Sequence, residues 1–383
     1  MKILHTSDLH LGRNLKEESL YDDQKYMLDE IIDVIKEQKV DVVIIAGDIY
    51  DKSIPSVDAV NLFNDFLDKL ADLKTETIII SGNHDSNERL AFGSNLFGKL
   101  NIHIETEYTG KMKKYSYNDV DIYTLPFIKP FHLKNLMKPE EYEKISSANE
   151  MMKWVLSQEK IDKSKKNILV MHQFVMNNGE KLELSDSEIA PSVGTLDSID
   201  ANLLDDFDYV ALGHIHKPQF VKRETIRYSG SPLKYSFSEV NNKNGVVLYD
   251  TDKNSIDIIP LKSKRNMQVL KGSFEEVMKM EPSDDLIKVI LTDENELISP
   301  MDELRKRFPN IMDIKYENRI SNLDFDMDSK DITERETPLS LFSKFYQMQN
   351  GRELNEDEIK YFNKTMEEIK YWDKKAENLG GDK

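Results

Sequence analysis

The chain has 383 residues, a formal net charge of −18 at pH 7 and no cysteine. It is long enough for a sizeable core and too long for one compact unit, so we expect a large domain with smaller appendages. The negative charge argues against a protein that grips nucleic acid through a broad basic surface, because Lys and Arg supply most non-specific affinity for phosphates. Without cysteine there are no disulfides, and any metal must be held by oxygen and nitrogen ligands.

Membrane insertion is also not expected from the sequence. No apolar run approaches the ~20 residues that span a bilayer. The sequence begins with a strand-like segment rather than a signal peptide. We therefore expect a cytoplasmic protein that has no contact with a membrane.

The N-terminal part alternates apolar strands with amphipathic helices. In chain order, the sequence predicts a strand over residues 1–6, a helix over about 18–38, a strand over 41–46, a helix over about 55–73 and a strand over 77–80. This repeated strand, helix and strand pattern is typical of an α/β domain.

The pattern then changes to shorter strands. The sequence predicts strands over residues 102–104 and 121–125, a helix over about 147–157, and strands over 167–172, 208–212, 225–228 and 245–249. The turn Ser229-Gly230-Ser231-Pro232 follows the strand over 225–228. We place the end of this first domain at residue 265.

The C-terminal part reads as three further segments. Residues 266–320 resemble a small α+β module with helices over 273–280 and 300–308 and strands over 286–291 and 312–316. Residues 321–336 are an acid-rich connector with too few apolar residues to pack. Residues 337–383 contain two helix-like pieces with a large apolar load, which must be buried on a partner or folded back onto the main domain.

Five predicted strands end in side chains that bind metals. These side chains are Asp8 and His10, Asp48, Asn83 and His84, His172, and His214 and His216. Two metal ions held together need a bridging carboxylate, with imidazole, amide and carboxylate groups completing each shell. We expect Asp48 to bridge, because its strand is the most buried. The remaining ligands divide into Asp8, His10 and His216 on one metal and Asn83, His172 and His214 on the other.

His84 is left over beside Asn83 and has a different expected role. It is placed to bond a phosphoryl oxygen or to protonate a leaving alkoxide, which is general-acid chemistry. Asp51 and Asp85 could orient its ring. The mixture of nitrogen and oxygen ligands favours Mn, Fe or Zn over Mg. A lone histidine after a strand is usually a satisfied interior residue, but five of the eight histidines fall at these strand ends.

The five blocks together resemble the calcineurin-like metallophosphoesterase superfamily. Its signature is D-x-H, G-D, G-N-H-D or E, a strand-end H, and G-H-x-H, and the chain carries all five blocks between Asp8 and His216. The segments Asp8 to Gly12, Gly47 to Asp51, Gly82 to Ser86 and Tyr228 to Pro232 further resemble the SbcD family of bacterial DNA exonuclease subunits. Archaeal and eukaryotic counterparts carry a second histidine at the position of Asp51.

The resemblance implies a fold, an activity and partners. The fold would be two mixed sheets packed face to face with helices outside, followed by a capping module and a helical tail. The activity would be that of a manganese-dependent nuclease with two metals, acting on double-stranded DNA ends and hairpins in DNA repair, recombination and replication. The partners would be DNA and an SbcC-type ATPase whose coiled coil binds the tail, in a heterotetramer containing a homodimer of this chain.

Two other functions remain open at this point. The same metal core serves phosphodiesterases and phosphatases that act on nucleotides or phosphoproteins. An interaction scaffold with a decayed site is also possible, although the intact ligand set argues against it.

Overall fold

The computed structural model describes residues 1–177, 182–186, 197–293, 297, 299–317, 337–350, 352–356 and 358–366. The chain divides into two compact units, one of Met1–Ile290 with Leu297–Lys315 and one of Leu291–Glu296 with Tyr316–Lys383. Within the described ranges, no helix is both long enough and apolar enough to cross a membrane.

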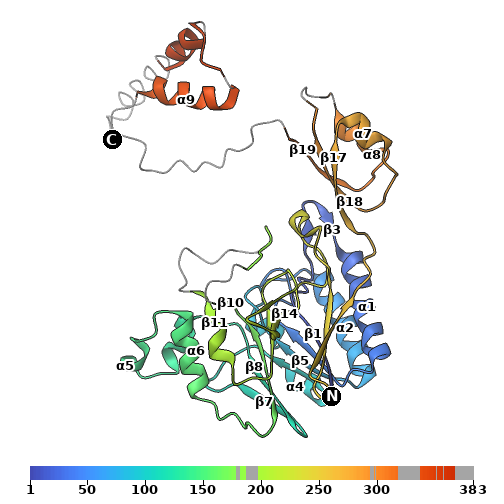
Figure 1. Cartoon of the computed structure of the whole chain (residues 1–383), viewed down its shortest axis with the longest axis vertical. Helices are drawn as coiled ribbons and strands as arrows, with labels where there is room; N and C mark the ends of the chain where they lie inside the picture. The colour runs from blue at the N-terminus through green and yellow to red at the C-terminus, as the bar shows by residue number, and fades with distance from the viewer. Residues whose placement is uncertain are drawn as a thin grey trace, which may run out of the picture. The chain divides into compact units, whose positions relative to one another are not determined.

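The first unit is built on two six-stranded sheets (Figure 1). The first sheet has the order β16 (Ser255–Pro260), β15 (Gly245–Asp250), β1 (Lys2–Thr6), β4 (Val42–Ala46), β5 (Glu76–Ile80) and β6 (Ile102–Glu105). The second has the order β13 (Gln219–Val221), β14 (Arg223–Tyr228), β12 (Tyr209–Gly213), β9 (Lys166–His172), β8 (Val120–Leu125) and β7 (Lys113–Tyr117). In the first sheet the strands β1, β4, β5 and β6 are parallel. In the second sheet the strands β14, β12, β9 and β8 are parallel.

The two sheets pack face to face with helices on their outer faces. Between the sheets lies an apolar layer that includes Ile44 and Ile78 from the first sheet and Val170 and Ala211 from the second. The helices α1 (Tyr21–Gln38) and α2 (Val57–Leu73) pack on the outer face of the first sheet. The helix α6 (Ala148–Ser157) packs on the outer face of the second. Strands covered on both faces must be apolar throughout, which is why β4 and β9 read as continuous apolar runs. The predicted fold class is confirmed.

Shorter elements connect these layers. They are β2 (Asn14–Leu15), β3 (Glu18–Ser19), α3 (Asn87–Leu90), α4 (Ser94–Phe97), η1 (Gly98–Leu100), η2 (Pro130–Asn135), α5 (Pro139–Tyr142), β10 (Val175–Met176), β11 (Ile199–Asp200), η4 (Ala201–Leu204) and η5 (Phe237–Glu239). The first helix starts at Tyr21 and not at residue 18, because Glu18 and Ser19 pair with Asn14 and Leu15 in a two-stranded ribbon.

A small three-stranded sheet follows the two large ones in the sequence. Its order is β17 (Met267–Gly272), β18 (Leu286–Leu291) and β19 (Ile311–Tyr316), with the helices α7 (Phe274–Lys279) and α8 (Pro300–Arg305). The helix α7 begins with a capping box, in which Ser273 and Glu276 satisfy each other's backbone N–H groups. The sequence predicted β18, β19 and both helices but missed β17. The predicted domain boundaries at 265, 320 and 336 stay predictions.

The second unit contains the helix α9 (Pro338–Asn350) and a further helical stretch over 358–366. The ring of Phe342 stacks on that of Phe362 at 4.5 Å between centroids. Arg352, which precedes the second helical stretch, forms an ion pair with Glu358 within that stretch, with 2.7 Å between Nη2 and Oε1. The predicted connector over 321–336 and the end of the predicted tail after residue 366 lie outside the described residues.

Candidate metal centre

The loops that follow β1, β4, β5, β9 and β12 meet at the carboxyl ends of the two sheets. The loops after β1 and β4 are bonded to each other through their main chains, with Asp8 N donating to Gly47 O and His10 N donating to Asp48 O, both at 3.0 Å. The His214 N–H donates to both carboxylate oxygens of Asp8 at 3.1 Å, which joins the second sheet to the first. Side chains from both sheets therefore face one another at a single rim.

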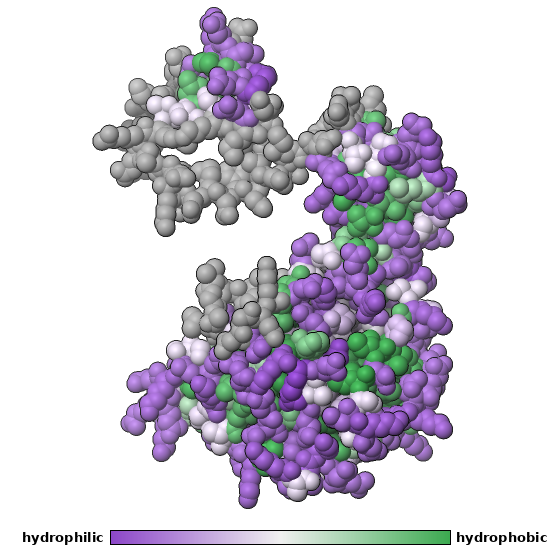
Figure 2. Space-filling view, in the orientation of Figure 1, coloured by the Kyte–Doolittle hydropathy of each residue, from purple (hydrophilic) through white to green (hydrophobic). Residues whose placement is uncertain are grey.

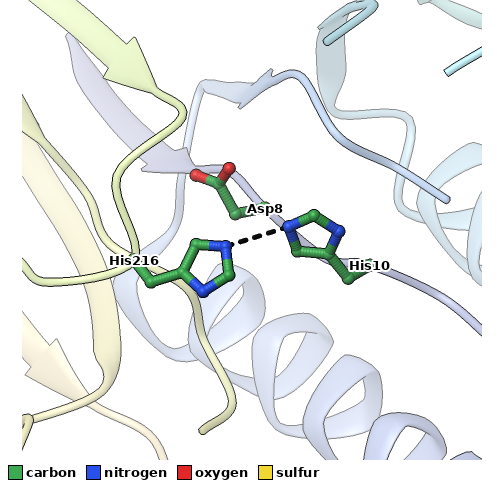
Figure 3. Close-up of side chains that lie close together, drawn as sticks. All are labelled: Asp8, His10 and His216. Atoms are coloured by element: carbon green, nitrogen blue, oxygen red, sulfur yellow. Dashed lines mark hydrogen bonds between the residues drawn. The ribbon is translucent and has the colours of Figure 1, made fainter. Parts of the chain in front are cut away.

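The first group of ligands is Asp8, His10 and His216. The Nε2 atoms of His10 and His216 lie 3.0 Å apart. Figure 3 shows the two rings facing each other beside the Asp8 carboxylate. One ligand atom from each of the three residues lies within 4.8 Å of the others, and all three side chains are buried. This is the set that the sequence predicted for one metal.

The second group is Asn83, His172 and His214. Asn83 Oδ1 lies 3.1 Å from His172 Nε2 and 2.8 Å from His214 Nδ1. Asp48 lies between the two groups, with Oδ2 at 3.3 Å from His172 Nε2 and 3.7 Å from His10 Nε2. All seven predicted ligands are thus brought together, with Asp48 in the middle. Their roles as ligands remain predictions.

The hydrogen bonds of His172 show that these side chains suit a cation. Its Nδ1–H donates to the carbonyl oxygen of Ala46 at 2.7 Å, so the ring directs Nε2 at the oxygens of Asp48 and Asn83. A lone pair facing two acceptors is repulsive unless a proton or a metal lies among them. Burial would lower the pKa of His172, but the charge of Asp48 outweighs burial and raises this pKa to about 9. A divalent metal can take the place of that proton.

The carboxylates of the site differ in their electrostatics. Burial alone would raise the pKa of Asp48, but the charges of His172 and His10 outweigh burial and hold it well below its usual range. Burial raises the pKa of the Asp8 carboxyl, which is fully buried. The neighbouring imidazoles therefore favour the charged form of Asp48, whereas burial disfavours the charged form of Asp8.

The backbone is bent sharply to present these ligands. Asp8, His10, Asp48 and His214 have φ values of 54°, 42°, 52° and 101°, which side-chain-bearing residues rarely adopt. Each such residue costs on the order of 1–3 kcal/mol and persists only where the surroundings enforce it. Gly82 cannot carry a side chain, because a Cβ there would collide with Asp48. Such backbone strain at ligand-bearing positions is typical of a functional site.

His84 lies beside these groups with its own hydrogen bonds. Its backbone N–H donates to Asp48 Oδ1 at 2.9 Å, and its Nδ1 lies 2.8 Å from the carbonyl oxygen of Asp51. The carboxylate of Asp51 instead pairs with Arg13 at 3.0 Å and lies 3.8 Å from His10 Nδ1. Asp51 therefore contacts His84 through its main chain.

The carboxylate of Asp85 makes contacts other than the predicted one with His84. Its carboxylate accepts hydrogen bonds from the backbone N–H groups of Ile49, Tyr50 and Gly82 at 2.9–3.1 Å. Burial and the nearby charge of Asp48 raise its pKa to about 6. Asp85 thus joins the loops after β4 and β5 rather than orienting His84, and the expectation of that orienting role was wrong.

Three polar residues at the site were missed by sequence reasoning. Glu239 Oε1 lies 3.1 Å from His216 Nδ1. The hydroxyl of Ser7 donates to Asp8 Oδ2 and lies 2.7 Å from the hydroxyl of Ser229. Ser7 precedes the segment Asp8 to Gly12 and Ser229 lies within the segment Tyr228 to Pro232, both of which the sequence singled out without giving these hydroxyls a role, whereas Glu239 stands in an ordinary polar stretch that gave no signal.

The chain is similar to two family models and to nuclease subunits from two bacteria. Residues 1–218 match the family model described as calcineurin-like phosphoesterase, and residues 263–350 match the one described as type 5 capsule protein repressor C-terminal domain. The SbcD subunit of the nuclease SbcCD from Staphylococcus epidermidis is 36% identical over 335 residues, covering 85% of this chain and 86% of that protein. The protein of the same name from Staphylococcus saprophyticus is 33% identical over 374 residues, covering 96% and 98%.

Proposed function

Because the chain belongs to the calcineurin-like phosphoesterase family, and within it to the SbcD nuclease subunits, we propose that it is a manganese-dependent DNA nuclease. It is a phosphodiester hydrolase, and the proposed substrates are double-stranded DNA ends and hairpins. The observation that supports this most is the convergence of six other oxygen and nitrogen ligands around Asp48. That donor set suits manganese better than magnesium, which prefers oxygen alone.

Hydrolysis adds water to phosphorus and breaks the bond from phosphorus to the leaving oxygen, which must then gain a proton. Two divalent metals, when bound, supply a hydroxide nucleophile near neutral pH and stabilise negative charge on the phosphate. Asp48 would contact both metals, Asp8, His10 and His216 would hold the first, and Asn83, His172 and His214 the second.

His84 supplies the remaining chemistry. With its Nδ1–H bonded to the Asp51 carbonyl, its Nε2 is the atom left for the substrate. The protonated ring donates its Nε2 proton to the leaving oxygen as the ester bond breaks. Asp51 fixes the ring through its main chain, which is the orienting role that we propose for this residue.

Cleavage of DNA by the purified chain tests this function. In manganese it should degrade linear duplex DNA, and His84→Ala should keep its metals while it loses cleavage. Cyclic nucleotides and nitrophenyl phosphates are the matched alternative substrates. Faster turnover of these small esters than of DNA would indicate a small-molecule phosphodiesterase or a phosphatase instead.

We also propose that the second unit binds the coiled coil of an SbcC-type ATPase. The relatives are named as subunits of SbcCD, and the apolar residues of α9 and the following helix are a large load for a terminal segment. Deletion of residues 337–383 should abolish association with the ATPase and spare hydrolysis of short substrates. Association that survives the deletion would contradict this assignment.

A homodimer of this chain within a heterotetramer completes the proposal. Two groups of large apolar side chains are exposed on the first unit: Ile54, Val57 and Val60 at the start of α2, and Phe92, Leu96 and Leu100 around α4. Figure 2 shows an apolar patch on the side of the unit where α1 and α2 lie. Patches of this kind usually mark protein interfaces. Val57→Glu with Phe92→Glu should give monomers by mass photometry, and an unchanged dimer would exclude this surface.

A further inference from the structure

We propose that Glu239 is a positioning residue of the metal centre, which holds His216 so that its Nε2 faces the first metal. Glu239 ends the short helix η5 and is fully buried, 23 positions after His216 in the chain. Its Oε1 lies 3.1 Å from His216 Nδ1. The proposal rests on the proposed function, because it assumes that the centre binds metals.

The Glu239 carboxylate is itself held in place. Its Oε2 accepts the backbone N–H of Tyr235 at 2.8 Å. The η5 turn is closed by the Glu239 N–H, which donates to Ser236 O at 3.0 Å. A buried carboxylate is costly unless it is paired and hydrogen-bonded. Both oxygens of Glu239 are engaged in this way, so it presents a fixed acceptor to the imidazole.

This hydrogen bond selects the tautomer of His216. An imidazole that donates from Nδ1 to a carboxylate carries its lone pair on Nε2. In His216 that atom lies 3.0 Å from His10 Nε2, in the group that we assign to the first metal. The carboxylate therefore directs the one ring nitrogen that can bind a cation toward the ligand group.

The second metal has no such dependence on Glu239. His172 is oriented by the carbonyl oxygen of Ala46 at 2.7 Å, and His214 Nδ1 lies 2.8 Å from Asn83 Oδ1. Carboxylates that orient ligating histidines typically contribute 10–100-fold to metal affinity. Removal of the Glu239 carboxylate should therefore weaken one metal site and leave the other nearly intact, which general loss of stability would not do.

Calorimetric titration of metal-free protein with Mn²⁺ tests this. Glu239→Ala should bind one Mn²⁺ with 10–100-fold lower affinity and the other within about 3-fold of the wild-type value. Glu239→Gln keeps an acceptor for the His216 Nδ1–H and should show a smaller loss at the same site. Asp121→Asn is the matched control. Asp121 is also buried, but it pairs with Lys114 and Lys165 at the N-terminal end of β8, away from the ligands at the carboxyl ends of the sheets.

Thermal unfolding in chelator, measured in parallel, reports whether each variant is folded. If Glu239→Ala does not fold, Glu239→Gln decides the outcome by the same comparison of the two sites. Wild-type affinity at both sites, or an equal loss at both, would overturn the role of Glu239. A wild-type protein that binds no Mn²⁺ would overturn the proposed function itself, which is a distinguishable result.

Discussion

The Nδ1 atom of His84 lies 2.8 Å from the main-chain carbonyl oxygen of Asp51. Any residue at position 51 can supply that acceptor, provided that the loop after β4 keeps its path. The Asp51 carboxylate is engaged elsewhere, with Arg13 at 3.0 Å. The orientation of the proposed general acid is thus set by backbone geometry, and the two side chains can be tested separately.

The first prediction concerns these two side chains. His84→Ala should lower kcat for DNA cleavage by about 10²–10⁴-fold, because general-acid catalysis contributes that much. Asp51→Asn should lower kcat by less than about 10-fold, because the carbonyl acceptor remains. Single-turnover cleavage of a labelled duplex in Mn²⁺ measures both effects. Equal losses in the two variants would show that the Asp51 carboxylate takes part in the chemistry.

The positions of the seven ligands and of His84 could be predicted because they follow from a simple rule. Polar residues placed directly after parallel apolar strands meet at one edge of a sheet. This rule needs only the strands, which apolar runs such as Val42–Ala46 mark clearly. The two sheets packed face to face do not follow from periodicity, since the alternation of strands and helices fits any α/β fold.

What the sequence could not reveal depends on contacts between distant or main-chain atoms. The Ala46 carbonyl that orients His172 and the Asp51 carbonyl that bonds His84 have no side-chain signature. Glu239 stands 23 positions after His216, and only the folded chain brings its carboxylate to His216 Nδ1. Asp85 was expected to be a partner of His84 because it is adjacent in sequence. Its carboxylate instead accepts hydrogen bonds from backbone N–H groups of the loops after β4 and β5.

The second prediction is that metals stabilise the first unit. The ligand loops combine strained backbone with buried charges, both of which a bound cation compensates. Manganese at about 100 times its dissociation constant adds about 2.7 kcal/mol for each site. Scanning calorimetry should show an increase in Tm on the order of 5–10 °C over chelated protein. His84→Ala should show the same increase, whereas Asp48→Asn should show little. A Tm that does not respond to manganese in the wild type would contradict this.

The third prediction uses His5, which is buried between the sheets with its Nδ1 2.9 Å from the Tyr209 hydroxyl. Burial, assisted by the charge of Arg227, lowers its pKa from 6.5 to about 3. Below pH 6.5 the unfolded chain gains a proton on His5 that the folded chain does not. Protonation of His5 therefore leaves the free energy of unfolding unchanged above pH 6.5 and lowers it as the pH falls from 6.5 toward 3. The loss is about 1.4 kcal/mol per pH unit.

Urea unfolding in chelator at pH 7.0, 6.0 and 5.0 measures this contribution. His5→Gln should lose less free energy of unfolding between pH 6 and 5 than the wild type, by about 1 kcal/mol. Taking the difference between the two proteins cancels the other buried histidines. Parallel curves for the two proteins would show that His5 titrates normally in the folded state.

The fourth prediction concerns Arg265, at the start of the segment that leads to β17. Its guanidinium bonds the buried carboxylate of Asp23 at 2.6 Å and Glu18 at 2.7 Å. Arg265→Ala leaves Asp23 as an unpaired buried charge and should lower the free energy of unfolding by about 3–5 kcal/mol.

The neighbouring Lys264 provides the control. It pairs with Asp22 at 2.7 Å, but both side chains are largely exposed. Exposed ion pairs contribute little, so Lys264→Ala should leave the urea midpoint nearly unchanged. Similar midpoints for Lys264→Ala and Arg265→Ala would mean that the Arg265 contact is also only a surface pair.

Anomalous diffraction from crystals soaked in Mn²⁺ tests the metal centre most directly. Data collected at the manganese edge should show two peaks about 3.5–4 Å apart, on either side of the Asp48 carboxylate. One peak should be contacted by His10 and His216, and the other by His172 and His214. No peak at this rim, or manganese bound only elsewhere on the chain, would contradict the account.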